Sequence, residues 1–304
     1  MKPRFPDILS SGYPLQCPQI HWRPTSPRRA KFWWYVHERI LKPLSDFYVR
    51  YYHGKRNRTG VHVLPFGLFL KSHENIREQE AMAMNLARAM GIPAPRALTF
   101  GAAADIPGTI PSILMTKVPG KHIGQVPTDQ INFDVIKDDL TKILARMRSF
   151  ASPWGDAVCG VDGRDVAGRY IPGTPIPPAD NEAGFYQSLK DATMFDRDYL
   201  RNSKDAIAGA EELFRLPPHA IVFTHGDMQW HNIMITPDSH ISGIVDWESA
   251  GWLPDYWEFS TAAIKRGPWG RIMNEEIAHN IYQKEVVGHY NMFLTFADLV
   301  IWNW

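Results

Sequence analysis

The sequence has few cysteines and almost no net charge. Its 304 residues include only two cysteines, Cys17 and Cys159, which stand far apart and form no CxxC pair. A disulfide framework is therefore excluded, and a reducing, cytoplasmic location is the simpler expectation. The 33 Lys and Arg residues nearly balance the 32 Asp and Glu residues, which gives a formal charge of +1. Because a dedicated nucleic-acid binder usually carries a basic excess, we expect no nucleic-acid partner.

Long apolar runs are absent as well. The Pro-rich N-terminus has no apolar core of the kind found in a secretory signal. The most apolar late stretch, 286–304, contains His289, Asn291 and Asp298, which would be costly inside a bilayer. We therefore predict no membrane partner and interpret this stretch as a buried amphipathic helix.

Two common kinds of catalytic or metal site are also missing. The chain has no GxSxG nucleophile elbow. His219, His225 and His231 follow one another at intervals of six residues, which gives them no shared face, and no cysteine assists them. A zinc site is therefore not predicted.

Glycine, proline and aromatic residues are plentiful and divide the chain into three regions. The 22 glycines and 24 prolines predict long loops, and 12% of the residues are aromatic. Residues 1–30 are interpreted as a loosely ordered N-terminal arm. Residues 31–118 are interpreted as a small lobe with one antiparallel sheet and one main helix. Residues 119–304 are interpreted as a larger, mostly helical lobe, with an irregular insertion over 151–184.

Periodicity sets the expected elements. An apolar stripe predicts a helix over 31–52, formed by Trp33, Val36, Ile40, Leu44, Phe47 and Tyr51, with Pro43 as a kink. Two strands joined by a turn at 65–67 should follow, then a helix over 74–90 and strands near 97–100 and 112–117. Further helices are expected over 129–150, 181–193 and 197–215, and again after residue 256.

Two short apolar runs, AIVFTHGD and ISGIVDWE, end in acidic residues. Asn232 follows Asp227 by five positions, and Asp246 follows Asn232 by 14. A carboxylate at such a place normally has a cation, a metal or a substrate, because burying it alone is costly. The spacing is typical of a kinase-type phosphotransfer site, in which one Asp accepts the hydroxyl proton. An Asn and a second Asp supply the oxygen ligands that Mg²⁺ prefers.

The segment 220–259, which contains both runs, resembles the aminoglycoside phosphotransferase family, and more closely its fungal branch. Gly226 stands where protein kinases usually have Arg, and Trp247, Glu248 and Glu258 continue the family pattern. Upstream segments appear in the expected order, so the resemblance covers roughly 55–265. It implies a two-lobed, protein-kinase-like α+β fold.

The resemblance also implies roles for particular residues. Asp227 would be the catalytic base, Asn232 and Asp246 would bind magnesium, and His225 would brace the catalytic loop. Lys71 would hold the phosphates and pair with Glu80, with Glu78 as the alternative partner. The hinge that meets the adenine would consist of Met115, Thr116, Lys117 and Val118.

The sequence departs from the family pattern at two places. The basic loop GKRNRTG at 54–60 lacks the GxGxxG spacing, and its charges would either replace close backbone contact with phosphates or form a solvated turn. Residues 229–231 are Gln-Trp-His, where the fungal branch often has a Pro-Arg pair. The resemblance therefore does not indicate which residues of this loop contact the substrate.

The implied activity is ATP- and Mg²⁺-dependent phosphorylation of a small-molecule hydroxyl acceptor. Acidic and basic residues balance from 259 to 304, four against four. A polycationic aminoglycoside needs an acidic pocket, so this balance favours a neutral or aromatic acceptor. The alternatives are a non-catalytic nucleotide-binding scaffold and a different biosynthetic reaction on the same fold. The preference for ATP or GTP, the oligomeric state, and whether the C-terminal tryptophans form core or pocket stay open.

Overall fold

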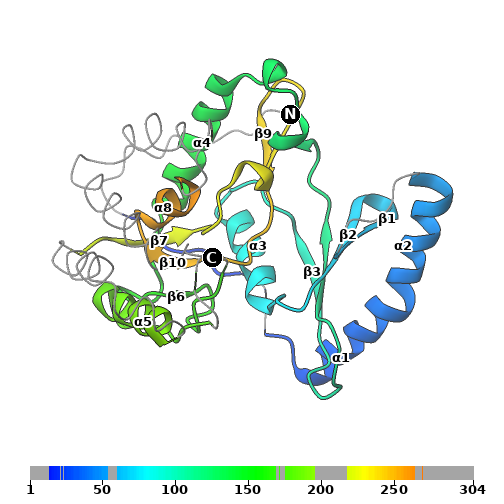
Figure 1. Ribbon diagram of the computed structural model, residues 1–304, viewed down its shortest axis with the longest axis horizontal. Helices are drawn as coiled ribbons and strands as arrows, with labels where there is room; N and C mark the ends of the chain where they lie inside the picture. The colour runs from blue at the N-terminus through cyan, green and yellow to red at the C-terminus, as the bar shows by residue number, and fades with distance from the viewer. Residues whose placement is uncertain are drawn as a thin grey trace.

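The computed structural model describes residues 14–20, 22, 24–53, 60–168, 171, 175–195, 218–263 and 269. The helix expected over 197–215, most of the basic loop 54–60 and the stretch 286–304 lie outside these residues. The described part forms a small lobe built on one sheet and a larger lobe that holds most of the remaining helices (Figure 1).

The sheet of the small lobe has four antiparallel strands in the order β1-β2-β4-β3. These are β1 (Val61–Leu64), β2 (Leu68–Ser72), β3 (Ala97–Gly101) and β4 (Ser112–Thr116). The helix α3 (Glu78–Ala89) lies between β2 and β3 in sequence and packs through buried Ala81, Met84 and Ala87. Its position confirms the predicted order of strand, strand, helix, strand, strand. The helix begins at Glu78 rather than 74, because residues 73–77 form a turn and an extended approach.

A long helix covers the other face of this sheet (Figure 1). It consists of α1 (Pro27–Val36), a π-helical segment His37–Leu41, α2 (Lys42–Tyr48) and a second π-helical segment Val49–His53. The helix begins four residues before the prediction, with proline at its first position, where the missing N–H costs nothing. Pro43 also stands near the start of a helical segment, after the first π-helical turn, so the chain continues past it.

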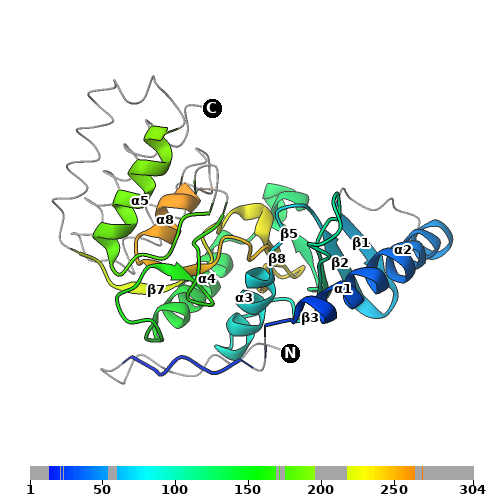
Figure 2. The ribbon, with the colours of Figure 1, turned by 90° about the horizontal axis from the view of Figure 1, so that it is seen from below.

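Residues 14–20, 22, 24 and 25 run past α3 (Figure 2). The backbone of Leu15 bonds to Ser149 and Ala151 at the end of α4. Glu78 at the start of α3 accepts hydrogen bonds from the side chains of Trp22 and Thr25, at 2.9 and 2.5 Å. Where the sequence predicts a loosely ordered arm, the described part of that arm therefore ties the two lobes together through specific contacts.

The larger lobe combines helices with two three-stranded sheets. Its helices are α4 (Phe133–Arg148), α5 (Glu182–Phe195) and α8 (Trp257–Ala263). One sheet has the order β6-β10-β7, from Cys159–Gly160, Gly251–Pro254 and Ile221–Thr224. The other has the order β5-β8-β9, from Lys121–His122, Ile233–Ile235 and Ile241–Ile244. Single bridges from Val158 to Ala179 and from Val166 to Ile176 hold together the insertion over 151–184.

One hydrophobic core runs from α3 through α4 to the strands of the larger lobe. Its aromatic centre is Phe223, whose ring stacks on Trp247 and also contacts Trp252. Trp252, Trp257 and Trp269 are all buried, so these three tryptophans belong to the core, whereas Trp302 and Trp304 lie outside the described residues. Within the described part of the chain, no helix has both the length and the apolarity needed to cross a bilayer.

Candidate active site

Lys71 lies at the centre of a charged cluster between the two lobes. Its Nζ donates to Glu80 Oε1 at 2.9 Å and to Asp246 Oδ1 at 2.6 Å. The strand β2 supplies the lysine, α3 supplies Glu80, and the segment after β9 supplies Asp246. Residues 175 positions apart thus meet through one ammonium group. Glu78 takes no part in this cluster, because its carboxylate is turned to Thr25 and Trp22.

Glu80 is almost fully buried, at 2% exposure. Burial raises the pKa of its carboxyl to about 7, although the nearby Lys71 charge acts in the opposite direction. Burial also disfavours the ammonium of Lys71, but the charges of Glu80 and Asp246 outweigh it and raise the pKa of the lysine. Lys71 therefore stays protonated throughout the physiological range, and Glu80 is the member of the pair that responds to pH.

The loop between β7 and β8 holds Asp227 and Asn232 together. The Asn232 side-chain amide donates to the Asp227 backbone oxygen at 2.9 Å and to its Oδ2 at 3.1 Å. Both side chains are buried, at 5% and 2% exposure. His231 approaches the same carboxylate, with Nε2 at 4.0 Å from Asp227 Oδ2. These contacts fix the direction of the Asp227 carboxylate before any substrate arrives.

His225 is fixed by the backbone on both sides of its ring. Its Nε2 lies 3.0 Å from the Val245 carbonyl oxygen, and its Nδ1 accepts the Asp227 N–H at 3.2 Å. A carbonyl only accepts, so Nε2 carries the proton and the ring is the neutral tautomer. His225 thus links the loop that holds Asp227 to the strand end that leads to Asp246. This arrangement suits a bracing role better than proton transfer.

Glu258 is a site residue for which the sequence analysis predicts no role. Its carboxylate accepts the N–H of His225 at 2.6 Å and that of Gly226 at 3.1 Å. Burial raises the pKa of Glu258, whereas nearby His225 acts in the opposite direction. The sequence signal was its place in the family pattern, but only the fold shows that the start of α8 reaches the catalytic loop.

The backbone is strained at two points of this site. Gly226 has φ +78°, and a Cβ there would stand 2.4 Å from the Ser249 carbonyl oxygen, so only glycine fits. Asp246 has φ +67°, which is uncommon for a residue with a side chain. Backbone strain of this kind is frequent where a side chain must be aimed at a ligand.

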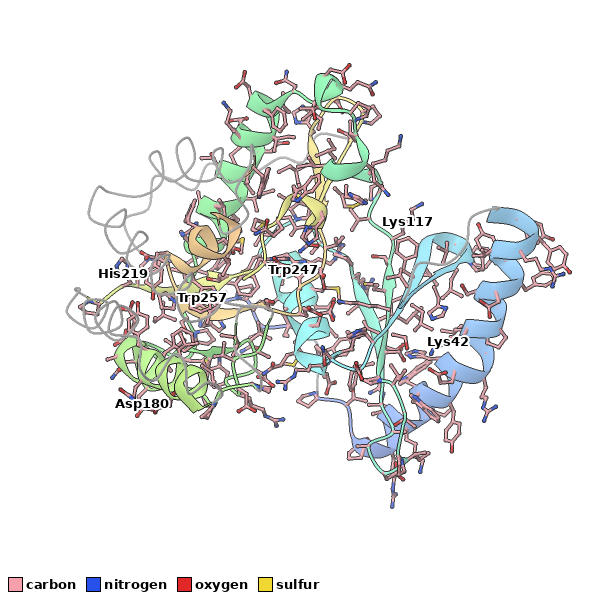
Figure 3. All side chains as sticks on the ribbon, viewed as in Figure 1. Lys42, Lys117, Asp180, His219, Trp247 and Trp257 are labelled. Carbon is pink, nitrogen blue, oxygen red and sulfur yellow. The ribbon has the colours of Figure 1, made fainter. Side chains whose placement is uncertain are left out.

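The predicted hinge continues from β4. The N–H groups of Thr116 and Lys117 already donate to the backbone oxygens of Arg96 and Gly67, at 3.0 and 2.7 Å. Val118 is buried and stands against Gly243 of β9, where the two lobes meet. A base bound here would therefore use the other backbone groups of this segment. Figure 3 shows Lys117 beside the sheet and Trp247, the neighbour of Asp246, close to α3.

The donor chemistry fits a hard divalent cation. Asn232 and Asp246 offer amide and carboxylate oxygens, and their segments are neighbours because the Val245 N–H donates to the Asn232 backbone oxygen at 2.9 Å. Among the described residues, no group of three or more His, Cys, Asp or Glu could hold a metal. Mg²⁺ needs no such cage, since it keeps several waters and shares its ligands with phosphate oxygens.

The fold and this site define a class of protein, the small-molecule phosphotransferases with a kinase-like fold. A thermostable mutant of the aminoglycoside phosphotransferase APH(4)-Ia, in ternary complex with AMP-PNP and hygromycin B, matches with TM-score 0.60 and 11% identity over 84% of this chain and 88% of that chain. Aminoglycoside phosphotransferase APH(3'')-Id from Streptomyces rimosus matches with TM-score 0.52 and 14% identity over 84% and 97%. The GDP and kanamycin complex of APH(2")-IIIa matches with TM-score 0.54 and 12% identity over 84% and 89%.

The chain belongs to the phosphotransferase enzyme family, whose model matches residues 50–282. No curated protein matches it. The match confirms the resemblance seen in the sequence, while the fungal branch receives no support. The structural similarity, at such low identity, shows the fold alone.

Proposed function

We propose that the protein transfers the γ-phosphoryl group of ATP, with Mg²⁺, to a hydroxyl group of a small neutral or aromatic molecule. The observation that carries this proposal is the cluster around Lys71, which joins Glu80 and Asp246 beside the Asp227–Asn232 loop. Lys71 is largely enclosed by three carboxylates, those of Glu80, Asp246 and Glu248, which come from both lobes. Because the cost of desolvating such charges can exceed their mutual attraction, a role in stability alone is a weak explanation for the cluster. Such a cluster serves a ligand that carries strong negative charge.

Each group of the cluster has a distinct role in the proposed reaction. Lys71 would bind phosphate oxygens, with Glu80 holding its ammonium in place. Asn232 and Asp246 would bind magnesium, which when present neutralises charge on the phosphates. Since Lys71 already donates to Asp246, nucleotide and cation together would replace this contact. Residues 115–118 would meet the base.

Asp227 is the base in the proposed phosphoryl transfer. The acceptor oxygen forms a bond to the γ-phosphorus, and the bond from that phosphorus to the β–γ bridging oxygen breaks, releasing ADP. The hydroxyl proton passes to the Asp227 carboxylate. Asn232 and His231 keep that carboxylate directed toward the acceptor. His225 holds the loop as a neutral brace and exchanges no proton.

The acceptor is proposed from sequence, because residues 264–268 and 270–304 lie outside the described part. Those residues carry all eight of the balanced charges that disfavour a polycation. The test is to incubate the purified protein with Mg-ATP and a pool of neutral sugars, polyols, phenols and nucleosides, and to analyse the products by mass spectrometry. We expect a phosphorylated acceptor that disappears when EDTA removes magnesium.

Other outcomes identify the alternatives. Efficient phosphorylation of kanamycin would overturn the neutral acceptor but keep the phosphotransfer. A condensed product without phosphate would indicate a different biosynthetic reaction, and nucleotide binding without any product from the pool or kanamycin would indicate a scaffold.

A further inference from the structure

The long helix Pro27–His53 exposes many of its large apolar residues. Seven large apolar side chains on it are between 40% and 74% exposed: Phe32, Tyr35, Ile40, Leu44, Phe47, Tyr51 and Tyr52. Most are three or four residues apart, so they line up along one outer face. We call this set the outer stripe. Contiguous exposed apolar surface of this kind marks an interaction site on a soluble protein.

The fully buried residues of the same helix are few, and two of them are polar. They are Ala30, His37, Ser45 and Val49. His37 bonds to Ser112 and Thr99 at 2.7 and 2.8 Å, and Ser45 donates to the Val63 backbone oxygen at 2.7 Å. Hydrogen bonds to the sheet thus help to hold the helix, while the seven large apolar residues of the outer stripe are left outside.

Positive charge gathers on the same segment. Residues 27–53 contain six of the 33 Lys and Arg residues but only two of the 32 Asp and Glu residues. The helix therefore carries +4, whereas the rest of the chain carries −3. Lys31 and Lys42 are paired with Asp105 and Glu38, but Arg28, Arg29, Arg39 and Arg50 are exposed.

We propose that the outer stripe docks on an anionic phospholipid surface, with the helix lying flat on the bilayer. Apolar side chains would enter the headgroup boundary, and the arginines would bind lipid phosphates and carboxylates. A second copy of the chain fits less well, because symmetric pairing of the two helices would bring Arg39 and Arg50 close to the same arginines of the other copy. A nucleic acid would leave Ile40, Leu44 and Phe47 without apolar partners.

The position of the helix suits this role. Both ribbon views place it at the edge of the molecule, and Figure 1 shows it on the side of the sheet away from α3. The Lys71 cluster, on the α3 side, would stay accessible to nucleotide. The sequence predicts no membrane partner because no segment can span a bilayer, whereas surface docking needs no spanning helix.

The test is cosedimentation with vesicles of phosphatidylcholine alone or mixed with phosphatidylserine. We expect wild-type protein to bind the mixed vesicles and to dissociate from them when salt is added. It should not bind vesicles of phosphatidylcholine alone. Arg39→Gln with Arg50→Gln should weaken binding about thirtyfold, at roughly fivefold for each charge. The triple variant Ile40→Ser, Leu44→Ser, Phe47→Ser should abolish binding while every charge remains.

Matched controls lie elsewhere on the surface. Trp154→Ser removes an exposed aromatic residue and Arg164→Gln an exposed charge, and neither should change vesicle binding. The proposal is overturned if wild-type protein binds neither kind of vesicle or binds both equally. It is overturned as well if the triple variant binds the mixed vesicles as tightly as wild type. It is also overturned if wild-type protein forms a dimer without lipid and the triple variant is a monomer, because the outer stripe would then be a dimer interface. None of these readouts depends on phosphoryl transfer.

Discussion

Glu258 shows how a single buried carboxylate can hold the loop between β7 and β8. It accepts the two N–H groups that precede that of Asp227. Hydrogen bonds to a charged group contribute more than neutral ones, so this carboxylate stabilises one conformation of the loop. The sequence shows this glutamate but not its partners, because His225 and Gly226 lie 33 and 32 positions away from it.

Replacing Glu258 by Gln should lower kcat about tenfold and leave the KM for ATP nearly unchanged. The amide can accept only one of the two N–H bonds, so the loop loses a fixed direction without losing nucleotide contacts. Steady-state kinetics measures the split between kcat and KM. Glu74→Gln, at an exposed position before α3, is the control. A rise in KM at constant kcat would contradict the bracing role.

The Lys71–Glu80 pair should make activity sensitive to acid. Because the pKa of Glu80 is raised to about 7, its carboxyl gains a proton as pH falls through that value. Lys71 then loses a charged partner, and kcat/KM should fall on the acid side of pH 7. In Glu80→Gln the maximum value of kcat/KM should be lower, and the fall in kcat/KM on the acid side should be absent. If the variant shows the same fall as wild type, the titration belongs to another group.

At the scale of elements, periodicity predicted most helices and strands but did not indicate which face of the first helix meets the sheet. The spacing over 31–52 correctly predicts a helix, and its apolar stripe would normally be placed in the core. In the structure Ile40, Leu44 and Phe47 of that stripe are exposed, while His37 is fully buried. Hydrogen bonds from His37 to the sheet decide this orientation, and a one-dimensional pattern contains no information about such distant partners.

Burial of His37 gives the small lobe a pH-dependent stability. Burial and the nearby Lys42 lower the pKa of this imidazole to about 4, below the unfolded value near 6.5. Below pH 6.5 the unfolded chain binds the proton and the folded chain does not. Stability is therefore complete above pH 6.5 and falls as pH drops toward 4, by up to about 3 kcal/mol.

Chemical denaturation at a series of pH values measures this loss. His37→Gln should be less stable than wild type at pH 7 but should lose much of the dependence between pH 6.5 and 4. His73→Gln, at an exposed turn, should keep the wild-type dependence. If the His37 variant keeps the full pH dependence of the free energy of unfolding, other groups account for that dependence.

At the scale of the whole molecule, the two-lobed fold and the family followed from one segment of 40 residues. The residues Asp227, Asn232 and Asp246 were recognisable because local spacing sets their positions at strand ends. Lys71 and Glu80 were found through their order along the chain, and the structure brings both to Asp246.

The segregation of charge was hidden in the balanced total. A sum of +1 conceals a basic helix on an otherwise acidic chain, and only the fold shows that this helix lies at an edge. The contact between residues 14–25 and Glu78 was equally hidden, because Trp22 and Thr25 lie more than fifty positions from their partner. Composition predicts such features poorly, since they arise from tertiary packing.

The most direct test of the central claim compares wild-type protein with Asp227→Asn in two assays. The first measures product formation from Mg-ATP and the pooled hydroxyl compounds, and the second measures Mg-ATP binding by calorimetry. We expect the variant to lose at least about a hundredfold in product formation, because it has no base for the hydroxyl proton, and to bind nucleotide as tightly as wild type. Asp129→Asn, an exposed substitution, should match wild type in both assays. Equal product formation by wild type and Asp227→Asn would contradict the account.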